Sequence, residues 1–193
     1  MKPLAVHGGA AAGLFAGCAV AWGLFELALA IRVRGGGGRD RSVLELTLAV
    51  LGGIALGQFA ARRAQGLALP GPGWWPVALG VVVFVLGLAL RAWAVRVLGR
   101  FFKFTVVVQA EHRVVDTGPY RLIRHPSYTG LLMVELGLGI MLGTWLSIPA
   151  CLLPPLIAFT ARLLTEECVL SRELGEPYRA YMARTKRLIP GVW

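Results

Sequence analysis

The sequence is poor in charge, and above all in acidic residues. Of its 193 residues 56% are hydrophobic and only 16% are charged, with 20 Lys and Arg against 10 Asp and Glu. Soluble domains average roughly 25% charged residues, so this shortage excludes an ordinary cytosolic enzyme and a disordered segment. The net charge of +10 would suit a nucleic-acid-binding protein, but apolar runs of about 20 residues do not. We therefore expect no nucleic-acid partner.

Cysteines and clusters of metal-ligating residues are also scarce. The three cysteines are Cys18, Cys151 and Cys168, and no two of them form a CxxC pair. Cys18 and Cys151 lie inside apolar runs, where a thiol behaves as a small hydrophobic group. The sequence thus excludes a disulfide-stabilised secreted domain and predicts no metal site.

Long apolar runs are what the sequence does contain. Five are predicted to be membrane helices, over residues 10–31, 43–61, 74–97, 128–143 and 146–164. About 20 apolar residues are needed to cross a bilayer, and the first run exceeds the roughly 7–15 apolar residues of a signal peptide. Only Thr144 and Trp145 separate the last two runs, which predicts an antiparallel helical hairpin.

The predicted fold class is therefore an all-α integral membrane protein of about five transmembrane helices, ending in a hairpin and an amphipathic tail. Fifteen Lys and Arg fall on one predicted side of the membrane and three on the other. Because cytoplasmic loops carry the excess of Lys and Arg, we expect the N-terminus outside and the C-terminal tail in the cytoplasm. All the polar, motif-bearing sequence then shares the cytoplasmic face.

The segment DTGPYRLIRHPSYTG, residues 116–130, is the first candidate functional region. His125 precedes a proline and is biased toward an extended backbone, whereas Pro126 and Ser127 suit the first turn of a helix. Free amides at such a helix start are a natural site for a carboxylate. An interfacial loop followed by a helix start would have the same pattern.

Two more candidate groups lie near the C-terminus. Arg162 and Glu166 are four residues apart and share one helical face; they either form a surface salt bridge or both point into a cavity. Tyr178 and Tyr181 either pack a terminal helix or reach a ligand.

Charges inside the apolar runs form a further group. Arg91 and Glu135 lie at matched depths in different runs, and intramembrane charges are usually paired or functional, so we predict an ion pair between them. Glu26 and Glu45, near the same interface, are expected to meet arginines of the loops.

Several motifs together resemble the isoprenylcysteine carboxyl methyltransferase family, within the wider group of membrane phospholipid methyltransferase-like proteins. They are GPYRLIRHPSYTG (118–130), TEECVL (165–170), LGEPYRAY (174–181) and RLIPG (187–191). The resemblance implies a membrane-embedded enzyme that uses S-adenosylmethionine. It also implies that residues 98–193 form the cofactor-binding catalytic region, while the three N-terminal helices of residues 1–97 supply the lipid-facing part of the site.

The family pattern assigns roles residue by residue. Arg162 would hold a substrate carboxylate, and Glu166 would neutralise the ammonium of the cofactor. Residues assigned to the cofactor are Gln109, His112, Arg113, Val114, Val115, Tyr120, His125, Pro126, Ser127, Tyr128 and Glu166. The implied partners are a lipophilic or prenylated substrate and membrane lipids; the oligomeric state is not predicted.

Other functions remain open from the sequence. A phospholipid N-methyltransferase shares a looser form of the motifs and would need a base near the methyl group, for which Glu167 or His125 is the candidate. A nicotinamide-dependent membrane reductase shares the His-Pro-x-Tyr pattern but lacks a glycine-rich dinucleotide motif in this chain. In a structural membrane protein, the charged pairs would only stabilise the bundle.

Overall fold

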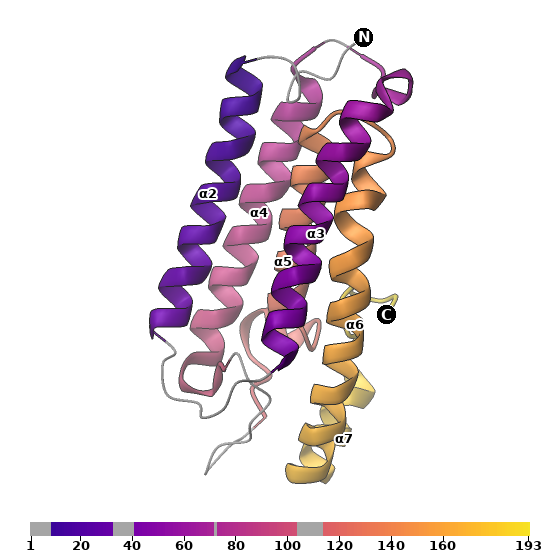
Figure 1. The fold of residues 1–193 in the computed structure, drawn as a ribbon. Coiled ribbons are helices and arrows are strands. Elements are labelled where there is room, and N and C mark those ends of the chain that lie inside the picture. The colour runs from indigo at the N-terminus through magenta and orange to yellow at the C-terminus, as the bar shows by residue number, and fades with distance from the viewer. Residues whose placement is uncertain (1–8, 33–40, 72, 104–113) are drawn as a thin grey trace.

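The protein is a bundle of long helices (Figure 1) in a computed structural model that describes residues 9–32, 41–71, 73–103 and 114–193. Three short 3-10 helices connect or precede the long elements, over Gln65–Leu67, Gly99–Phe101 and Gly118–Arg121. The α-helices are α2 (Gly9–Arg32), α3 (Arg41–Arg63), α4 (Trp75–Leu98), α5 (Pro126–Met141), α6 (Ser147–Glu173) and α7 (Glu176–Arg184).

Four of these helices are long and apolar enough to cross a membrane among the described residues: α2, α3, α4 and α6. The predicted all-helical membrane fold is confirmed, and the first three predicted runs coincide with α2, α3 and α4 to within about two residues at each end. Much of the surface of these helices is apolar, with leucines and valines more than half exposed. Such a surface is compatible with lipid rather than water, so the chain is a multi-pass membrane protein.

Helix α5 differs from the predicted fourth membrane span, residues 128–143. Its 16 residues reach only about 24 Å at 1.5 Å per residue, less than the roughly 30 Å of a bilayer core. It packs against α4 on one side and α6 on the other, and Val134, Leu138 and Met141 are completely buried. A helix surrounded by protein needs no apolar surface for lipid.

The predicted hairpin is present between α5 and α6. Ser147 caps the turn, because its amide donates to Thr144 Oγ1 at 3.1 Å and its hydroxyl donates to the Gly139 carbonyl at 2.8 Å. Helix α6 then continues nine residues beyond the predicted end at Leu164, because no glycine or proline follows Leu164 until Gly175, whose φ is +62°. Glu166 and Glu167 therefore extend from the same rigid helix as Arg162.

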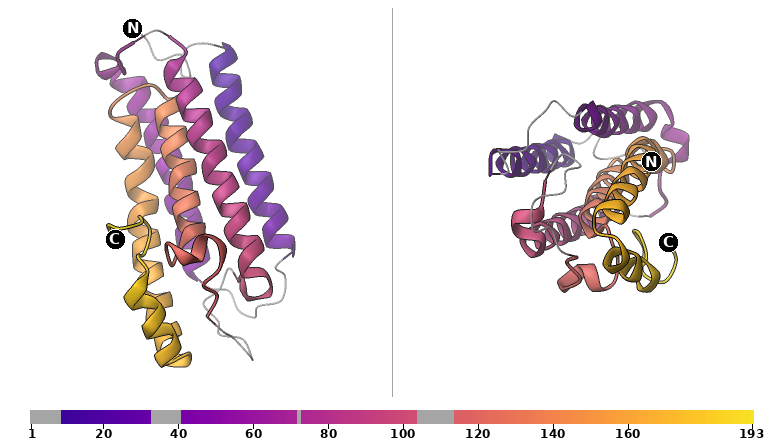
Figure 2. Two further views of the ribbon diagram at one scale, coloured as in Figure 1. Left: turned by 180° about the vertical axis from the view of Figure 1, so that it is seen from behind. Right: turned by 90° about the horizontal axis from the view of Figure 1, so that it is seen from below.

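The C-terminal segment folds back on the start of α5 (Figure 2, left). The amides of Arg124 and His125 donate to the carbonyls of Lys186 and Arg187 at 2.7 and 3.0 Å, and Thr129 Oγ1 donates to the Leu188 carbonyl at 2.8 Å. These bonds fix the backbone on both sides of His125 and hold the N-terminal end of α5 beside α6 and α7.

Helices α4 and α5 touch backbone to backbone through glycines. A methyl group added at Gly87 would lie 2.7 Å from the Gly130 carbonyl oxygen, and one at Gly80 would lie 2.6 Å from that of Gly137. Small residues at such positions allow helices in membranes to approach closely. The two glycines on each helix are seven residues apart, so the contact follows one face over two turns.

We expect Gly87→Ala to lower the thermal midpoint of the detergent-solubilised protein, although alanine is the better helix former. The added methyl must push α4 and α5 apart, and overpacking of this kind costs about 1–3 kcal/mol. Gly52→Ala on α3, where no described atom lies within 4 Å of the new methyl, is the control and should leave the midpoint unchanged or raise it. Equal midpoints for the two variants would contradict the close packing.

Candidate functional site

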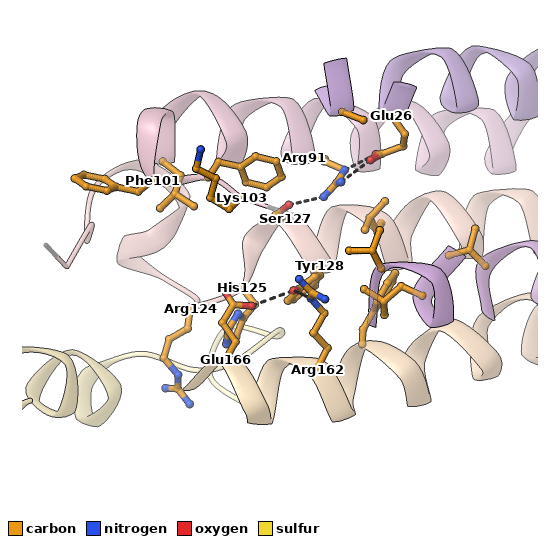
Figure 3. Close-up of a pocket in the computed structure, with 18 of the residues that line it drawn as sticks. Glu26, Arg91, Phe101, Lys103, Arg124, His125, Ser127, Tyr128, Arg162 and Glu166 are labelled. Atoms are coloured by element: carbon orange, nitrogen blue, oxygen red, sulfur yellow. Dashed lines mark hydrogen bonds and ion pairs between the residues drawn. The ribbon is translucent and has the colours of Figure 1, made fainter. Parts of the chain in front are cut away.

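A cavity of about 880 Å³ lies at the end of the bundle where α5 begins, within the usual size of ligand pockets, about 300–1,000 Å³. One wall is apolar and comes from α2 and α3, including Leu27, Leu46 and Ile54. The opposite wall is polar and comes from residues 114–128, α6 and α7. Figure 3 shows the polar side chains gathered between α4 above and α6 below.

Tyr128 is at the centre of the polar wall. Its hydroxyl donates to Glu166 Oε2 at 3.0 Å and accepts from Arg162 Nε at 3.0 Å. The ring stacks between His125 and Phe159, with centroid distances of 5.6 and 5.4 Å. Arg162 and Glu166 thus both line the cavity and are linked through Tyr128, which favours the cavity interpretation of their spacing over a surface salt bridge.

The start of α5 offers fewer free amides than the sequence predicted. Pro126 has no N–H, and the amides of Tyr128 and Thr129 both donate to the His125 carbonyl, at 3.0 and 3.1 Å. Side chains take a larger part instead, because the hydroxyls of Ser127 and Tyr128 accept hydrogen bonds from two arginines of the cavity, Arg91 of α4 and Arg162 of α6. An anion at this end would therefore be held mainly by side chains.

The predicted ion pair between Arg91 and Glu135 is wrong. Arg91 instead meets Glu26 of α2: Nε and Nη2 lie 2.5 and 2.6 Å from the two carboxylate oxygens, and Nη1 donates to Ser127 Oγ at 2.5 Å. Glu26 in turn meets a residue of α4 and no loop arginine in the described part of the chain. Matched depth was insufficient evidence because it does not specify which faces of two helices meet.

Glu135 faces the other side of α5. It precedes Gly139 by one turn on the same face, and Gly139 packs against Ser147, Ile148 and Cys151 of α6. Both carboxylate oxygens are buried without a hydrogen bond to any described residue. Burial of a polar group without a partner is unfavourable, and the carboxyl group plays no part in the cavity.

Glu167, considered above as a base, does not line the cavity. Its Oε1 lies 2.7 Å from Arg124 Nε and 3.1 Å from His125 Nε2, and its Oε2 lies 3.0 Å from Arg187 Nε. Arg124 Nη1 also donates to the carbonyls of Met182 and Thr185. This carboxylate therefore joins α6 to the start of α5, α7 and the C-terminal segment.

Three buried tyrosines complete the polar wall at the α7 end. Tyr181 donates its hydroxyl to the Tyr120 carbonyl at 2.8 Å, and Tyr178 and Tyr181 both pack and line the cavity. Burial, and next the negative charge of Glu166, raise the pKa of the Tyr120 phenol above its usual range. The phenol is thus a neutral hydroxyl at physiological pH.

The structure brings together most of the residues that the sequence placed in the site. Those that line the cavity are Val114, Val115, Tyr120, His125, Ser127, Tyr128, Arg162 and Glu166. Pro126 is the first residue of α5 and does not line the cavity. Gln109, His112 and Arg113 lie outside the described residues.

Sequence reasoning gave no site role to several lining residues, among them Glu26, Arg91, Phe101 and Lys103. The available signal was the presence of charge inside the first and third apolar runs. It marked Glu26 and Arg91 as unusual without showing that both face one cavity.

The fold and the cavity define a multi-pass membrane protein with a pocket that joins an apolar wall to a polar one. The profile of the isoprenylcysteine carboxyl methyltransferase family matches residues 78–172, a stretch that contains the Tyr128, Arg162 and Glu166 network. The resemblance predicted from the motifs is confirmed over this region of the chain.

Individual relatives agree with the family match. The chain is 32% identical over 121 residues to protein-S-isoprenylcysteine O-methyltransferase B of Arabidopsis thaliana, covering 62% of this chain and 61% of the relative. It is 33% identical to protein-S-isoprenylcysteine O-methyltransferase of Tribolium castaneum, over 61% of this chain and 43% of that one. The chain thus spans about three fifths or less of the length of these two relatives.

A solved structure described as the eukaryotic intramembrane Ras methyltransferase ICMT is similar in fold, with a TM-score of 0.62. That structure is 28% identical in sequence, and the match covers 76% of this chain and 52% of the solved one.

We expect Glu167→Ala to destabilise the protein by about 3–5 kcal/mol, the usual cost of removing one partner from a buried ion pair. Arg124 and His125, both buried, would lose their carboxylate. The measurement is the thermal midpoint in detergent. Glu173→Ala, an exposed glutamate near the end of the same helix, is the control, and an equal effect of the two substitutions would contradict a structural role for Glu167.

Proposed function

We propose that this protein transfers a methyl group from S-adenosylmethionine to the carboxylate of a lipophilic, isoprenylcysteine-like acid in the membrane. The observation that carries the proposal is the Arg162–Tyr128–Glu166 network within one cavity that has an apolar wall on its other side. The named activity of the relatives supports it. Such a cavity lets a water-soluble donor and an oily acceptor meet.

The residues present fit the cofactor. Glu166 is a partly buried carboxylate that already accepts a hydrogen bond from Tyr128, so it can accept further bonds from an ammonium group. Val114, Val115 and Tyr120 line the same region of the cavity and offer apolar and aromatic surface to an adenosine. When bound, S-adenosylmethionine supplies the electrophilic methyl group of its sulfonium.

The chain's own task is to bind and align the acid. An α-carboxylate has a pKa of about 3.3–3.7 and is already ionised at neutral pH, so the reaction needs no general base. This agrees with the placement of Glu167, which does not line the cavity and is bonded to Arg124, His125 and Arg187. We assign Glu167 to positioning of the site rather than to proton transfer.

Arg162 is the residue that we assign to the reacting carboxylate. A guanidinium offers a planar fork of donors that matches a carboxylate, and the Tyr128 hydroxyl orients this one at its Nε. Phe159 and Leu131 line the cavity nearby and exclude water, so alignment of the two reactants rather than acid–base chemistry lowers the barrier.

We also place the cavity on the cytoplasmic side of the membrane. The ends of α2, α4 and α6 at the cavity carry the arginine-rich segments (Figure 1), and cytoplasmic segments carry the excess of Lys and Arg. An accessibility assay on single cysteines in oriented vesicles would test this orientation, with the wild-type Cys168 replaced by serine.

The experiment that tests the function is calorimetry of the full chain in detergent with S-adenosylhomocysteine, followed by a methylation assay on an S-farnesylcysteine acid. Glu166→Ala should weaken S-adenosylhomocysteine at least about tenfold, since a charge-assisted hydrogen bond contributes about 1.5–3 kcal/mol. Arg162→Ala should leave that affinity nearly unchanged and abolish turnover of the acid. The reverse pattern would mean that the two roles are exchanged.

The type of product discriminates between the methyltransferases. A methyl ester releases its methyl group as methanol in mild base, whereas an N-methyl product is stable there. We expect base-labile incorporation from the acid substrate. Base-stable incorporation, or binding of a reduced nicotinamide nucleotide in place of S-adenosylhomocysteine, would contradict the proposed function.

A further inference from the structure

Helix α2 is the wall of the cavity that is held least firmly. It has small contacts with α4 and α5, and only Ala11, Phe15 and Trp22 are buried along its length. Figure 2 (right) shows it at the edge of the bundle, apart from α6 and α7. Among the described residues, the polar contact between α2 and the rest of the bundle is made by Glu26.

The geometry of that contact is a two-pronged fork. Both oxygens of Glu26 accept from Arg91, at 2.5 and 2.6 Å, and Oε1 also accepts from Trp22 Nε1 at 3.3 Å. The side chain of Arg91 is 4% exposed and that of Glu26 is 25% exposed. Two parallel N–H···O bonds are the strongest and most specific way for an arginine to hold a carboxylate.

The fork lies inside the cavity assigned above to the acid substrate. Arg91 and Glu26 both line it, between the polar wall and the apolar wall formed by α2 and α3 (Figure 3). Arg91 is held by Ser127 and Arg162 by Tyr128, which are consecutive residues of α5. The cavity is thus lined by three arginines, Arg91, Arg124 and Arg162. Arg124 binds the buried Glu167, whereas Arg91 binds Glu26, a carboxylate that itself lines the cavity.

We propose that Glu26 is an internal stand-in for the substrate carboxylate. An acid whose tail lies between α2 and α3 displaces Glu26 from Arg91 on its way to Arg162, and Arg91 is thereby a specificity-determining residue. Removal of a carboxylate from a buried guanidinium is costly unless another carboxylate replaces it. A neutral lipid, including the methyl ester product, cannot open the fork, and Glu26 returns when the ester has formed.

This inference rests on the proposed function, and binding distinguishes the two. The probe pair is N-acetyl-S-farnesylcysteine and its methyl ester, which have the same tail and differ in charge. The measurement is ligand-dependent thermal stabilisation of the full chain in detergent, titrated to half-saturation, which needs no turnover.

Glu26→Gln removes the internal competitor and keeps the shape of the side chain. We expect the acid to reach half-saturation at a concentration at least about fivefold lower than in the wild type, the lower end of usual coupling factors, with the ester unchanged. Glu45→Gln, the same change at an exposed position on α3, is the matched control and should not alter either titration. Arg91→Gln should reduce the preference for acid over ester, while Arg162 still favours the acid.

If Glu26→Gln folds poorly because Arg91 loses its partner, Glu26→Asp keeps the charge and shortens the reach to Arg91. The proposal would then be supported if Glu26→Asp binds the acid more tightly than the wild type does, with a gain in affinity smaller than that expected for Glu26→Gln. Acid binding that is unchanged or weaker in the folded variant, or a shift shared by the ester, would overturn it. Failure of the wild type to bind S-adenosylhomocysteine would instead count against the proposed function and leave this acid-against-ester comparison interpretable.

Discussion

The backbone contact between α4 and α5 is the constraint on which the site depends. Gly87 and Gly130 bring the two helices so close that a methyl added at Gly130 would lie 2.8 Å from the amide nitrogen of Arg91. The same contact places Arg91 within 2.5 Å of Ser127 Oγ. The geometry of one wall of the cavity is therefore set by helix packing, and the polar groups follow from it.

A second constraint joins elements that are distant in sequence. Glu167 of α6 binds residues that precede α5 and a residue of the C-terminal segment, while main-chain bonds hold that segment against Arg124 and His125. Residues around positions 125, 167 and 187 thus form one unit. This explains why the family motifs lie in separate parts of the sequence with a helical hairpin between them.

The sequence predicted the helices and most of the polar wall, for physical reasons. Apolar runs of about 20 residues have few structural alternatives in a membrane, and the four-residue spacing of Arg162 and Glu166 places them on one face whatever the tertiary fold. Pairing between helices was not predictable, because it depends on rotation about each helix axis. Arg91 and Glu135 show this: their depths matched, but one faces α2 and the other faces α6.

The burial of α5 and the length of α6 were missed for a related reason. Hydropathy distinguishes apolar from polar segments, but it does not distinguish a helix that contacts lipid from one enclosed by protein. The glycines of α4 and α5 are evenly spaced in the sequence, yet only their apposition in the structure identifies them as a contact.

Four carboxylates of the helix bundle differ in what surrounds them, and these surroundings separate their roles. Glu167 is bonded to two arginines and a histidine, and its departure would leave the buried Arg124 without its carboxylate. Glu166 shares one hydroxyl and is partly exposed, so it retains capacity for a ligand. Glu26 is held by a single arginine at the least supported helix, which is the arrangement that permits exchange. Glu135 has no described hydrogen-bond partner and lies away from the others. Position alone would group all four as acidic residues at a membrane site, whereas their partners distinguish a structural hub, a binding group, an exchangeable group and an isolated one.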